Sequence, residues 1–396
     1  MTTRGPSDAY SEGPSPCPPG DGVGSPGVVA YRWSMPPIDP DATPQTRALL
    51  RNLAALEGRH VLFGHQDDLA YGTHWSADDG GPDGRSDVRD VTGAYPSVQG
   101  FDVGQVETGA DRNVDGLPFV DIRRWVRQAH AGGSVVTVSW HASHLPTGGP
   151  TWTRVETIPD LLPGGSHAQA FTAALDRLAD FLADLTDDAG RPIPVVFRPY
   201  HEHNGEWFWW GRGFNREADF VALWRQTVEH LRDRRGLHHL LYAISPDRSR
   251  IDIGGFDEDY LYGYPGDDYV DILGVDDYWD FGHEHNPATQ ERQHADLVTT
   301  LTRVAQLAQE RGKPAVLAEV GTLGGIPDPW TGYLLGALTA NADTRRILWT
   351  LSWRNPTGQP ERTYTPSPGD PAAADLAAYA RDPFVLLDDR MPDLYG

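Results

Sequence analysis

Short apolar runs alternate with amphipathic stretches along most of the chain. Eight runs are rich in Val, Ile and Leu and are bounded by Gly, Pro or Asp, as is typical of β-strands. Their near-continuous apolar character fits parallel strands that are buried on both faces. The eight predicted strands are VLFGHQ (61–66), SVQGFDV (97–103), SVVTVSWH (134–141), PVVFRPYHE (194–202), HLLYAISP (239–246), VDILGVDDYW (270–279), PAVLAEVG (314–321) and RRILWTLSW (345–353).

Helical patterns occupy most of the segments between these runs. In residues 167–185, apolar side chains recur at spacings of four, three, four and three, and residues 286–312 show a similar periodicity. A third helix is predicted over residues 216–235, with Asn215 as its N-cap and Gly236 at its end.

Eight strands with intervening helices predict an α/β fold of the single (β/α)8 TIM barrel type. A doubly wound open sheet is the alternative. That fold is expected to carry a Gly-rich phosphate loop after its first strand, and the segment FGHQDD (63–68) is not such a loop. We expect residues 28–396 to form this one domain. Residues 1–27 contain six Gly, six Pro and four Ser, and we expect them to form a disordered tail.

Charge and composition narrow the classes of partner. The formal net charge of −23 would repel a phosphate backbone, so we expect no nucleic acid partner. No apolar run approaches the roughly 18 residues of a membrane span, so no membrane partner is expected either. The single cysteine, Cys17, permits no intrachain disulfide and no thiolate metal site. The first residues lack the apolar segment of a signal peptide, which predicts a cytoplasmic protein unless export follows another route.

Ionisable and aromatic residues gather at the carboxyl ends of the predicted strands. In a (β/α)8 barrel the catalytic residues project from these ends. The amino ends of the strands lack such groups. No ionisable side chain is present at Val61, Ser97, Ser134, Pro194 or Pro314. This asymmetry predicts an active site at the carboxyl ends, which carry His65 with Asp67 and Asp68, Asp102, Trp140 with His141, His201 with Glu202, Asp247, Asp276 with Asp277, Tyr278 and Trp279, Glu319, and Trp353 with Arg354.

Two glutamates, Glu202 and Glu319, lie at the ends of two of these strands. A carboxylate at the end of an apolar strand is costly unless it is hydrogen-bonded or solvated in a pocket. Two carboxylates that face each other across a barrel mouth are the parts of a glycosidase. We expect Glu202, flanked by rings and histidines, to have the raised pKa of an acid, and Glu319 to be the nucleophile. Arg198 or Arg354 nearby would keep a carboxylate ionised.

The position of Glu202 raises a geometric difficulty. Strict alternation along the strand would direct His201 and Glu202 to opposite faces. Both reach one pocket only if the strand ends there or bulges. Glu206 is a rival acid four residues further on, and we interpret it as a rim residue.

Histidine-rich spots raise the question of a metal ion. His65 with Asp67, the HEH of residues 201–203, and His283 with His285 are the candidates. The HEH spacing differs from the i, i+4 spacing of helical zinc sites, and we interpret these histidines as hydrogen-bonding groups. We therefore expect no metal ion and no cofactor. The chain also lacks the GxSxG nucleophile elbow of an α/β-hydrolase.

Several segments resemble glycoside hydrolase family 26, whose members are mostly β-mannanases. RPYHEHNGEWFWWG (198–211) is similar to the acid/base motif of that family, and LAEVG (317–321) to its nucleophile motif. The resemblance runs from about residue 44 to the C-terminal DPFVLLDD and includes LFGHQDDLAYG (62–72), GRSDVRDVTGAYPSVQGFDVGQVE (84–107) and LSWRN (351–355).

The resemblance implies a retaining enzyme that cleaves β-1,4-mannosidic bonds in mannan-type polysaccharides or manno-oligosaccharides. Glu202 would be the acid/base and Glu319 the nucleophile. Six residues would bind substrate: His201 near the cleaved bond or at the acid/base, Trp207 on the leaving-group side, His141 at the sugar before the cleavage point, Tyr278 on the nucleophile, Trp353 as a stacking floor, and Arg354 beside it. Apart from the resemblance, we interpret Trp209 and Trp210 as residues that pack the loop in place, and which of the three tryptophans contacts substrate stays open.

One segment departs from the family pattern. The Trp-His pair opens the segment WHASHLPTGG (140–149). The family often carries Asn-Pro a few residues after this pair, and this chain does not. The resemblance therefore does not define the negative subsites. Some family members cleave β-1,3-xylan or mixed-linkage β-glucan by the same mechanism, which leaves the sugar open. A non-catalytic carbohydrate-binding barrel is the alternative of another class, and the intact glutamate pair argues against it.

Overall fold

Eight parallel strands close into a barrel in the computed structural model, which describes residues 36–77, 84–321, 325–359 and 362–396. The barrel closes where Leu62 to His65 pair with Trp349 to Ser352. Each predicted strand contains one observed strand, so the (β/α)8 prediction is confirmed. The barrel strands are β1 (Val61–Gln66), β4 (Val98–Asp102), β5 (Val135–Trp140), β6 (Val195–Pro199), β7 (Leu240–Ile244), β8 (Ile272–Asp277), β9 (Ala315–Val320) and β10 (Ile347–Ser352).

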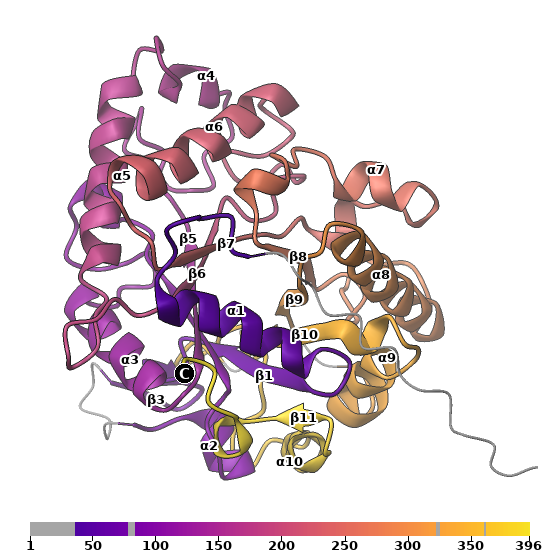
Figure 1. Ribbon diagram of the computed structural model, residues 1–396. Coiled ribbons are helices and arrows are strands. Elements are labelled where there is room, and N and C mark those ends of the chain that lie inside the picture. Colours follow the sequence, from indigo (N-terminus) through magenta and orange to yellow (C-terminus); the bar gives the residue numbers. More distant parts are fainter. Residues whose placement is uncertain (1–35, 78–83, 322–324, 360–361) are drawn as a thin grey trace, which may run out of the picture. The chain divides into compact units, whose positions relative to one another are not determined.

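Helices surround the barrel (Figure 1). The predicted periodicity is observed in α5, where Phe171, Leu175, Leu178 and Leu182 are buried in the main core. The helices are α1 (Pro44–Leu56), α2 (Asp87–Thr92), α3 (Phe119–Ala131), α4 (Ile158–Leu161), α5 (Ala168–Ala183), α6 (Glu217–Glu229), α7 (Phe256–Tyr260), α8 (Gln290–Glu310), α9 (Leu335–Leu338) and α10 (Ala373–Arg381). Within the described ranges, no helix combines the length and the apolar character needed to cross a bilayer.

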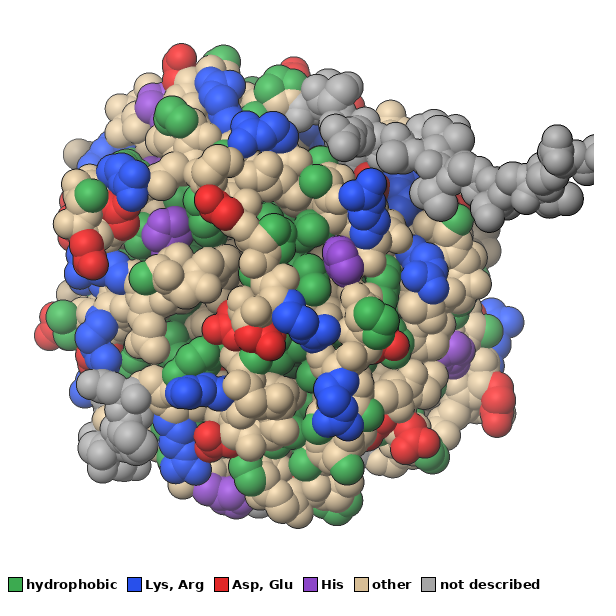
Figure 2. Space-filling view, turned by 60° about the horizontal axis from the view of Figure 1, so that its bottom comes forward, with side chains coloured by type: hydrophobic (Ala, Val, Ile, Leu, Met, Phe, Trp, Pro, Cys, Tyr) green, Lys and Arg blue, Asp and Glu red, His purple; other side chains and the backbone are tan. Residues whose placement is uncertain are grey.

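The surface mixes both signs of charge. On the face in Figure 2, Lys and Arg side chains lie scattered among Asp and Glu side chains and neutral atoms. The predicted tail, residues 1–27, lies outside the described residues.

Helix α1 closes the amino-terminal end of the barrel, and Figure 1 shows it lying across the strands. Its buried residues Leu49, Leu50, Leu53 and Leu56 form one apolar cluster with residues inside the barrel such as Leu62. Thr43 caps the helix by accepting the N–H of Thr46, and Pro44 occupies its first turn. This apolar layer explains why the amino-terminal ends of the strands carry no ionisable group.

The N-cap predicted for residues 216–235 is wrong. α6 begins at Glu217, and the Oδ1 atom of Asn215 instead accepts the N–H groups of Thr157 and Ile158, at 3.2 and 3.0 Å, where α4 begins. Asn215 therefore joins two loops that are far apart in the sequence. The predicted end at Gly236 is confirmed, because a π turn (His230–Arg234) extends α6 and Gly236 then adopts a φ of +66°.

Asp87 anchors the long loop after β1. This loop contains the two-stranded hairpin β2 (Tyr71–Gly72) and β3 (Trp75–Ser76). The Asp87 carboxylate accepts the backbone N–H of Thr73 at 2.8 Å, the indole N–H of Trp75 at 2.9 Å, and the amide N–H of Asn355 at 3.0 Å. One buried acid thus fixes the loop after β1 to the loop after β10.

A short additional strand, β11 (Val385–Leu386), extends the barrel sheet. It runs parallel to β1 and pairs with Val61 and Leu62 of that strand.

The α1 layer predicts a specific cost for shortening Leu53, which is fully buried. Leu53→Ala is expected to lower the free energy of unfolding by about 2–5 kcal/mol, because it removes buried methyl groups and leaves a cavity. Urea unfolding followed by tryptophan fluorescence measures this change. Val120→Ala on α3 is the control, since Val120 is 70% exposed and its truncation should cost less than about 0.5 kcal/mol. Equal costs for the two variants would contradict the assigned role of α1.

Candidate active site

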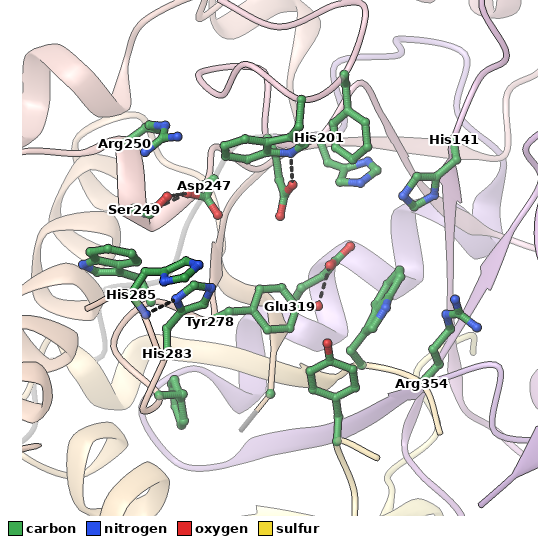
Figure 3. Close-up of a pocket in the computed structure, with 18 of the residues that line it drawn as sticks. His141, His201, Asp247, Ser249, Arg250, Tyr278, His283, His285, Glu319 and Arg354 are labelled. Atoms are coloured by element: carbon green, nitrogen blue, oxygen red, sulfur yellow. Dashed lines mark hydrogen bonds between the residues drawn. The ribbon is translucent and has the colours of Figure 1, made fainter. Parts of the chain in front are cut away.

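A cavity of about 880 Å³ opens at the carboxyl ends of the barrel strands. It brings together all eight residues predicted for the site: His141, His201, Glu202, Trp207, Tyr278, Glu319, Trp353 and Arg354. Figure 3 shows His141 and Arg354 at one end of the cavity, Arg250, His283 and His285 at the other, and Glu319 between them.

The chain after β6 turns so that His201 and Glu202 both face the cavity. β6 ends at Pro199, and Tyr200 and Glu202 adopt left-handed backbone angles, with φ of +51° and +54°. The N–H of Glu202 donates to the carbonyl of Ser245 at 2.7 Å, which ties this turn to the end of β7. Left-handed angles are costly for non-glycine residues and persist where the surroundings impose them, often at functional sites. Of the two possibilities left open by the sequence, a strand that ends or a strand that bulges, the structure shows the first, because β6 ends before His201.

Glu202 is buried, and its carboxyl group accepts a hydrogen bond from the loop that follows it. The indole N–H of Trp207 donates to its Oε2 atom at 2.6 Å. Burial raises the pKa of Glu202 well above its usual value, and the nearby acids Asp247, Asp276 and Glu319 add to this, while the bond from Trp207 opposes it. A carboxyl group that keeps its proton near neutral pH can serve as a general acid.

Glu319 lies in the opposite electrostatic environment. The guanidinium group of Arg198 donates to its Oε1 atom, and the hydroxyl of Tyr278 donates to Oε2 at 2.8 Å. Arg198 also donates to Asp276 Oδ2 and to Ser245 Oγ, each at 3.0 Å. Hydrogen bonds from a cation to a carboxylate are among the strongest in proteins. Of the two arginines expected near a catalytic carboxylate, Arg198 is the one that contacts Glu319.

The two glutamates lie close together. One carboxylate oxygen from each of Glu202, Asp276 and Glu319 lies within 4.8 Å of the other two. Carboxyl groups about 5–5.5 Å apart act as acid/base and nucleophile in retaining glycosidases, whereas inverting enzymes separate them by about 6.5–9.5 Å. By distance alone the three oxygens could also ligate a cation, but the charge of Arg198 already lies between Asp276 and Glu319.

Two histidines of opposite character lie beside the acid. Nδ1 of His141 lies 2.7 Å from Oδ2 of Asp102. Burial alone would lower the pKa of His141, but the facing carboxylate of Asp102 outweighs it and raises that pKa. The ring of His201 lies 4.5 Å from that of His141, and burial together with this neighbour lowers the pKa of His201 well below its usual value. A histidine with a lowered pKa, His201, and a histidine with a raised pKa, His141, thus share one wall of the cavity.

Trp353 and Arg354 follow β10 and line the same end of the cavity as His141. The ring centroids of Trp353 and His141 are 6.2 Å apart. Arg354 pairs with Asp115 at 3.0 Å and lies 3.5 Å from the Tyr71 hydroxyl, so it is held by the loops around this end rather than by Glu319.

The remaining tryptophans of the segment 198–211 support the loop, as predicted. Trp209 and Trp210 are buried, and their indole N–H groups donate to the carbonyls of Ala142 and His201, each at 2.8 Å. Glu206 lies at the rim, where its carboxylate pairs with Arg250 at 2.8 Å.

Several lining residues were not predicted as site residues, because loops bring them in. They include Asp115, Trp152, Phe208, Ser249, Arg250, His283, His285 and Tyr364. Trp152 is 52% exposed and lies in the loop after β5, where the sequence departs from the family pattern. Tyr364 packs onto Gly321, where an added Cβ would lie 2.1 Å from its ring. The glycine after the Glu319 strand was the available signal for this contact.

Comparison with known proteins gives consistent matches. The family model "Glycosyl hydrolase family 26" matches residues 38–334. A mannan endo-1,4-β-mannosidase of Bifidobacterium adolescentis is 32% identical over 359 residues, which cover 86% of this chain and 34% of that protein. The chain thus spans about a third of that relative's length.

Solved structures agree with these sequence matches. A β-mannanase structure from Bacteroides ovatus has a TM-score of 0.81 and 35% identity, and covers 89% of this chain and 98% of its own. A modular endo-β-1,4-mannanase from Cellulomonas fimi has a TM-score of 0.80 and 34% identity, and covers 91% of this chain and 79% of its own.

The raised pKa of Glu202 predicts how stability depends on pH. Its pKa in the folded protein lies above the value of about 4.5 in the unfolded chain, so the wild type loses stability as pH rises from there through the folded pKa. Glu202→Gln cannot ionise and still accepts the bond from Trp207. Its melting temperature relative to wild type is therefore expected to rise between pH 4 and pH 8, by about 2 °C or more.

Differential scanning calorimetry at the two pH values measures this difference. Glu206→Gln at the exposed rim is the control and should show a smaller change with pH. A melting-temperature difference for Glu202→Gln that falls as pH rises would contradict the assignment.

Proposed function

Because the chain belongs to glycosyl hydrolase family 26, we propose that it is a retaining glycoside hydrolase that cleaves β-1,4-mannosidic bonds in mannan-type polysaccharides or manno-oligosaccharides. The observation that carries this proposal is the close pair of Glu202 and Glu319 in opposite electrostatic environments. The mannan endo-1,4-β-mannosidase and β-mannanase relatives support the choice of sugar.

In the first step, Glu319 acts as the nucleophile. Its carboxylate oxygen attacks the anomeric carbon, and the bond from that carbon to the leaving oxygen breaks. Glu202 gives its proton to the leaving oxygen, so the leaving sugar departs as a neutral alcohol. The product is a glycosyl ester on Glu319, and Glu202 is left ionised.

In the second step, water replaces the enzyme at the same carbon. Glu202, now a carboxylate, takes a proton from the water as its oxygen attacks the anomeric carbon. The ester bond to Glu319 breaks and the carboxylate is restored. Two inversions at one carbon retain its configuration.

The surrounding residues position the sugar and the nucleophile. The donors from Tyr278 and Arg198 hold the Glu319 carboxylate in position. We propose that the ring of Trp353 packs against the apolar C–H face of the pyranose, and that Trp207 contacts the leaving sugar. His141, fixed by Asp102, would donate a hydrogen bond to a sugar hydroxyl.

Two alternative functions would use the same cavity, namely hydrolysis of another glycan and sugar binding without catalysis. A relative named endoglucanase H, from Acetivibrio thermocellus, is 29% identical over 142 residues, so a β-glucan is the second candidate substrate alongside β-1,3-xylan. A non-catalytic sugar-binding barrel would not need a donor-held nucleophile beside a protonated acid.

Product analysis on β-1,4-mannan, β-1,3-xylan and mixed-linkage β-glucan, run side by side, tests the proposal. We expect reducing ends to form from mannan, and proton NMR of the first product to show the β-anomer before mutarotation. An α-anomer as first product would contradict retention, and cleavage of only one of the other two glycans would reassign the substrate. A protein that binds mannan oligosaccharides but cleaves none of the three would be a binding module.

A further inference from the structure

Trp207 contacts two ionisable groups at once. Its indole N–H donates to Glu202 at 2.6 Å, and the guanidinium carbon of Arg250 lies 5.2 Å from the centroid of its ring. A cation over a tryptophan ring at this distance is attracted to the ring's negative face. The same arginine pairs with Glu206, the residue before Trp207 in the chain, at 2.8 Å. Arg250 is therefore bound to both the ring and its own loop.

Gly205 accommodates the other part of the ring. A Cβ atom added at Gly205 would lie 2.4, 2.5 and 2.7 Å from three carbons of the six-membered ring of Trp207. Side chains essentially never approach so closely, so the indole fits in this position only because residue 205 is a glycine. The ring is thus bounded by the Gly205 backbone and by Arg250.

The two loops that form this arrangement are joined independently of Trp207. The side-chain amide of Asn204 donates to the carbonyl of Asp247 at 2.8 Å and accepts the N–H of Asp247 at 2.8 Å. Both atoms of the amide are used, and both residues are buried. This pair fixes the loop after β7, which carries Arg250, against the loop after β6, which carries Trp207. Figure 3 shows Arg250 with Asp247 and Ser249 at one end of the cavity.

We propose that Arg250 and Gly205 are positioning residues that hold the indole of Trp207 so that its N–H keeps the Glu202 carboxyl aimed at the leaving oxygen. This inference rests on the proposed function, because it assigns the arrangement to the acid step of that mechanism. Arg250 does not act on the reacting atoms itself; it acts through Trp207.

The proposal distinguishes substrates by their leaving groups. A sugar leaving group needs the proton of Glu202, whereas a dinitrophenolate leaves as a stable anion without it. The value of kcat/KM reports the steps up to the first bond cleavage. A variant that misplaces Glu202 should therefore lose kcat/KM on an oligosaccharide and keep it on a dinitrophenyl glycoside.

The test compares mannotetraose with 2,4-dinitrophenyl β-mannobioside. Arg250→Ala is expected to lower kcat/KM about tenfold on mannotetraose, a part of the 10²–10⁴-fold that general acid catalysis contributes. On the dinitrophenyl substrate it should change kcat/KM by less than about twofold. Arg250→Lys keeps the cation and should restore part of the loss. Gly205→Ala should give the same split, since it displaces the ring from the other side.

A matched control and a double mutant complete the design. Arg123 on α3 also lies over a ring, 4.4 Å from the Phe181 centroid, and pairs with Asp184 at 3.5 Å, but it does not line the cavity. Arg123→Ala should leave both kcat/KM values unchanged. In a Trp207→Phe background, which lacks the indole N–H, Arg250→Ala should have no further selective effect on mannotetraose.

Three results would overturn the inference: an equal loss on both substrates, no loss on mannotetraose, or a selective loss that persists in the Trp207→Phe background. The first and third would mean that Arg250 binds the sugar directly. Melting temperatures of all variants show whether each is folded. A folded wild type that cleaves neither substrate would overturn the proposed function itself, whereas an active wild type with unaffected variants overturns this inference alone.

Discussion

A single buried guanidinium, that of Arg198, determines how the site is charged. It donates to Glu319 and to Asp276 but not to Glu202, although oxygens of all three acids lie within 4.8 Å of one another. The cation thus contacts one glutamate of the pair and not the other, and burial raises the pKa of the other, Glu202. Burying such a group is costly unless its donors are used, and here Ser245 accepts from it as well. The division of the two glutamates into nucleophile and acid therefore follows from where Arg198 lies.

The barrel makes this arrangement rigid. Arg198 lies on β6, Asp276 on β8 and Glu319 on β9, so backbone ladders set their separation. The acid is held differently, because Glu202 follows the end of β6 in a strained turn, and among the described residues its side chain accepts a hydrogen bond from Trp207 alone. The acid thus lies in a loop after β6 and is held by a loop residue, whereas the nucleophile lies on β9 itself.

The sequence was most informative where local pattern and fold agree. Buried parallel strands produce continuous apolar runs, so all eight strands were predictable, and the residues after them marked the cavity. Contacts between distant loops leave no local pattern. Asn215 has the residue type of an N-cap, yet its partners lie 58 and 57 residues away in the chain. Trp152, Arg250 and Tyr364 reach the cavity on loops whose paths depend on tertiary packing, so only the assembled structure shows them.

The most direct measurement of the central claim is the identity of the residue that bonds to the sugar. With Glu202 replaced by alanine, 2,4-dinitrophenyl β-mannobioside can form the glycosyl ester, but its hydrolysis lacks the base that activates water. Intact-protein mass spectrometry should show one added mannobiosyl group, and peptide mapping should place it on Glu319. A label on another residue, or turnover of this substrate with no label and with inverted product, would contradict the roles assigned to the two glutamates.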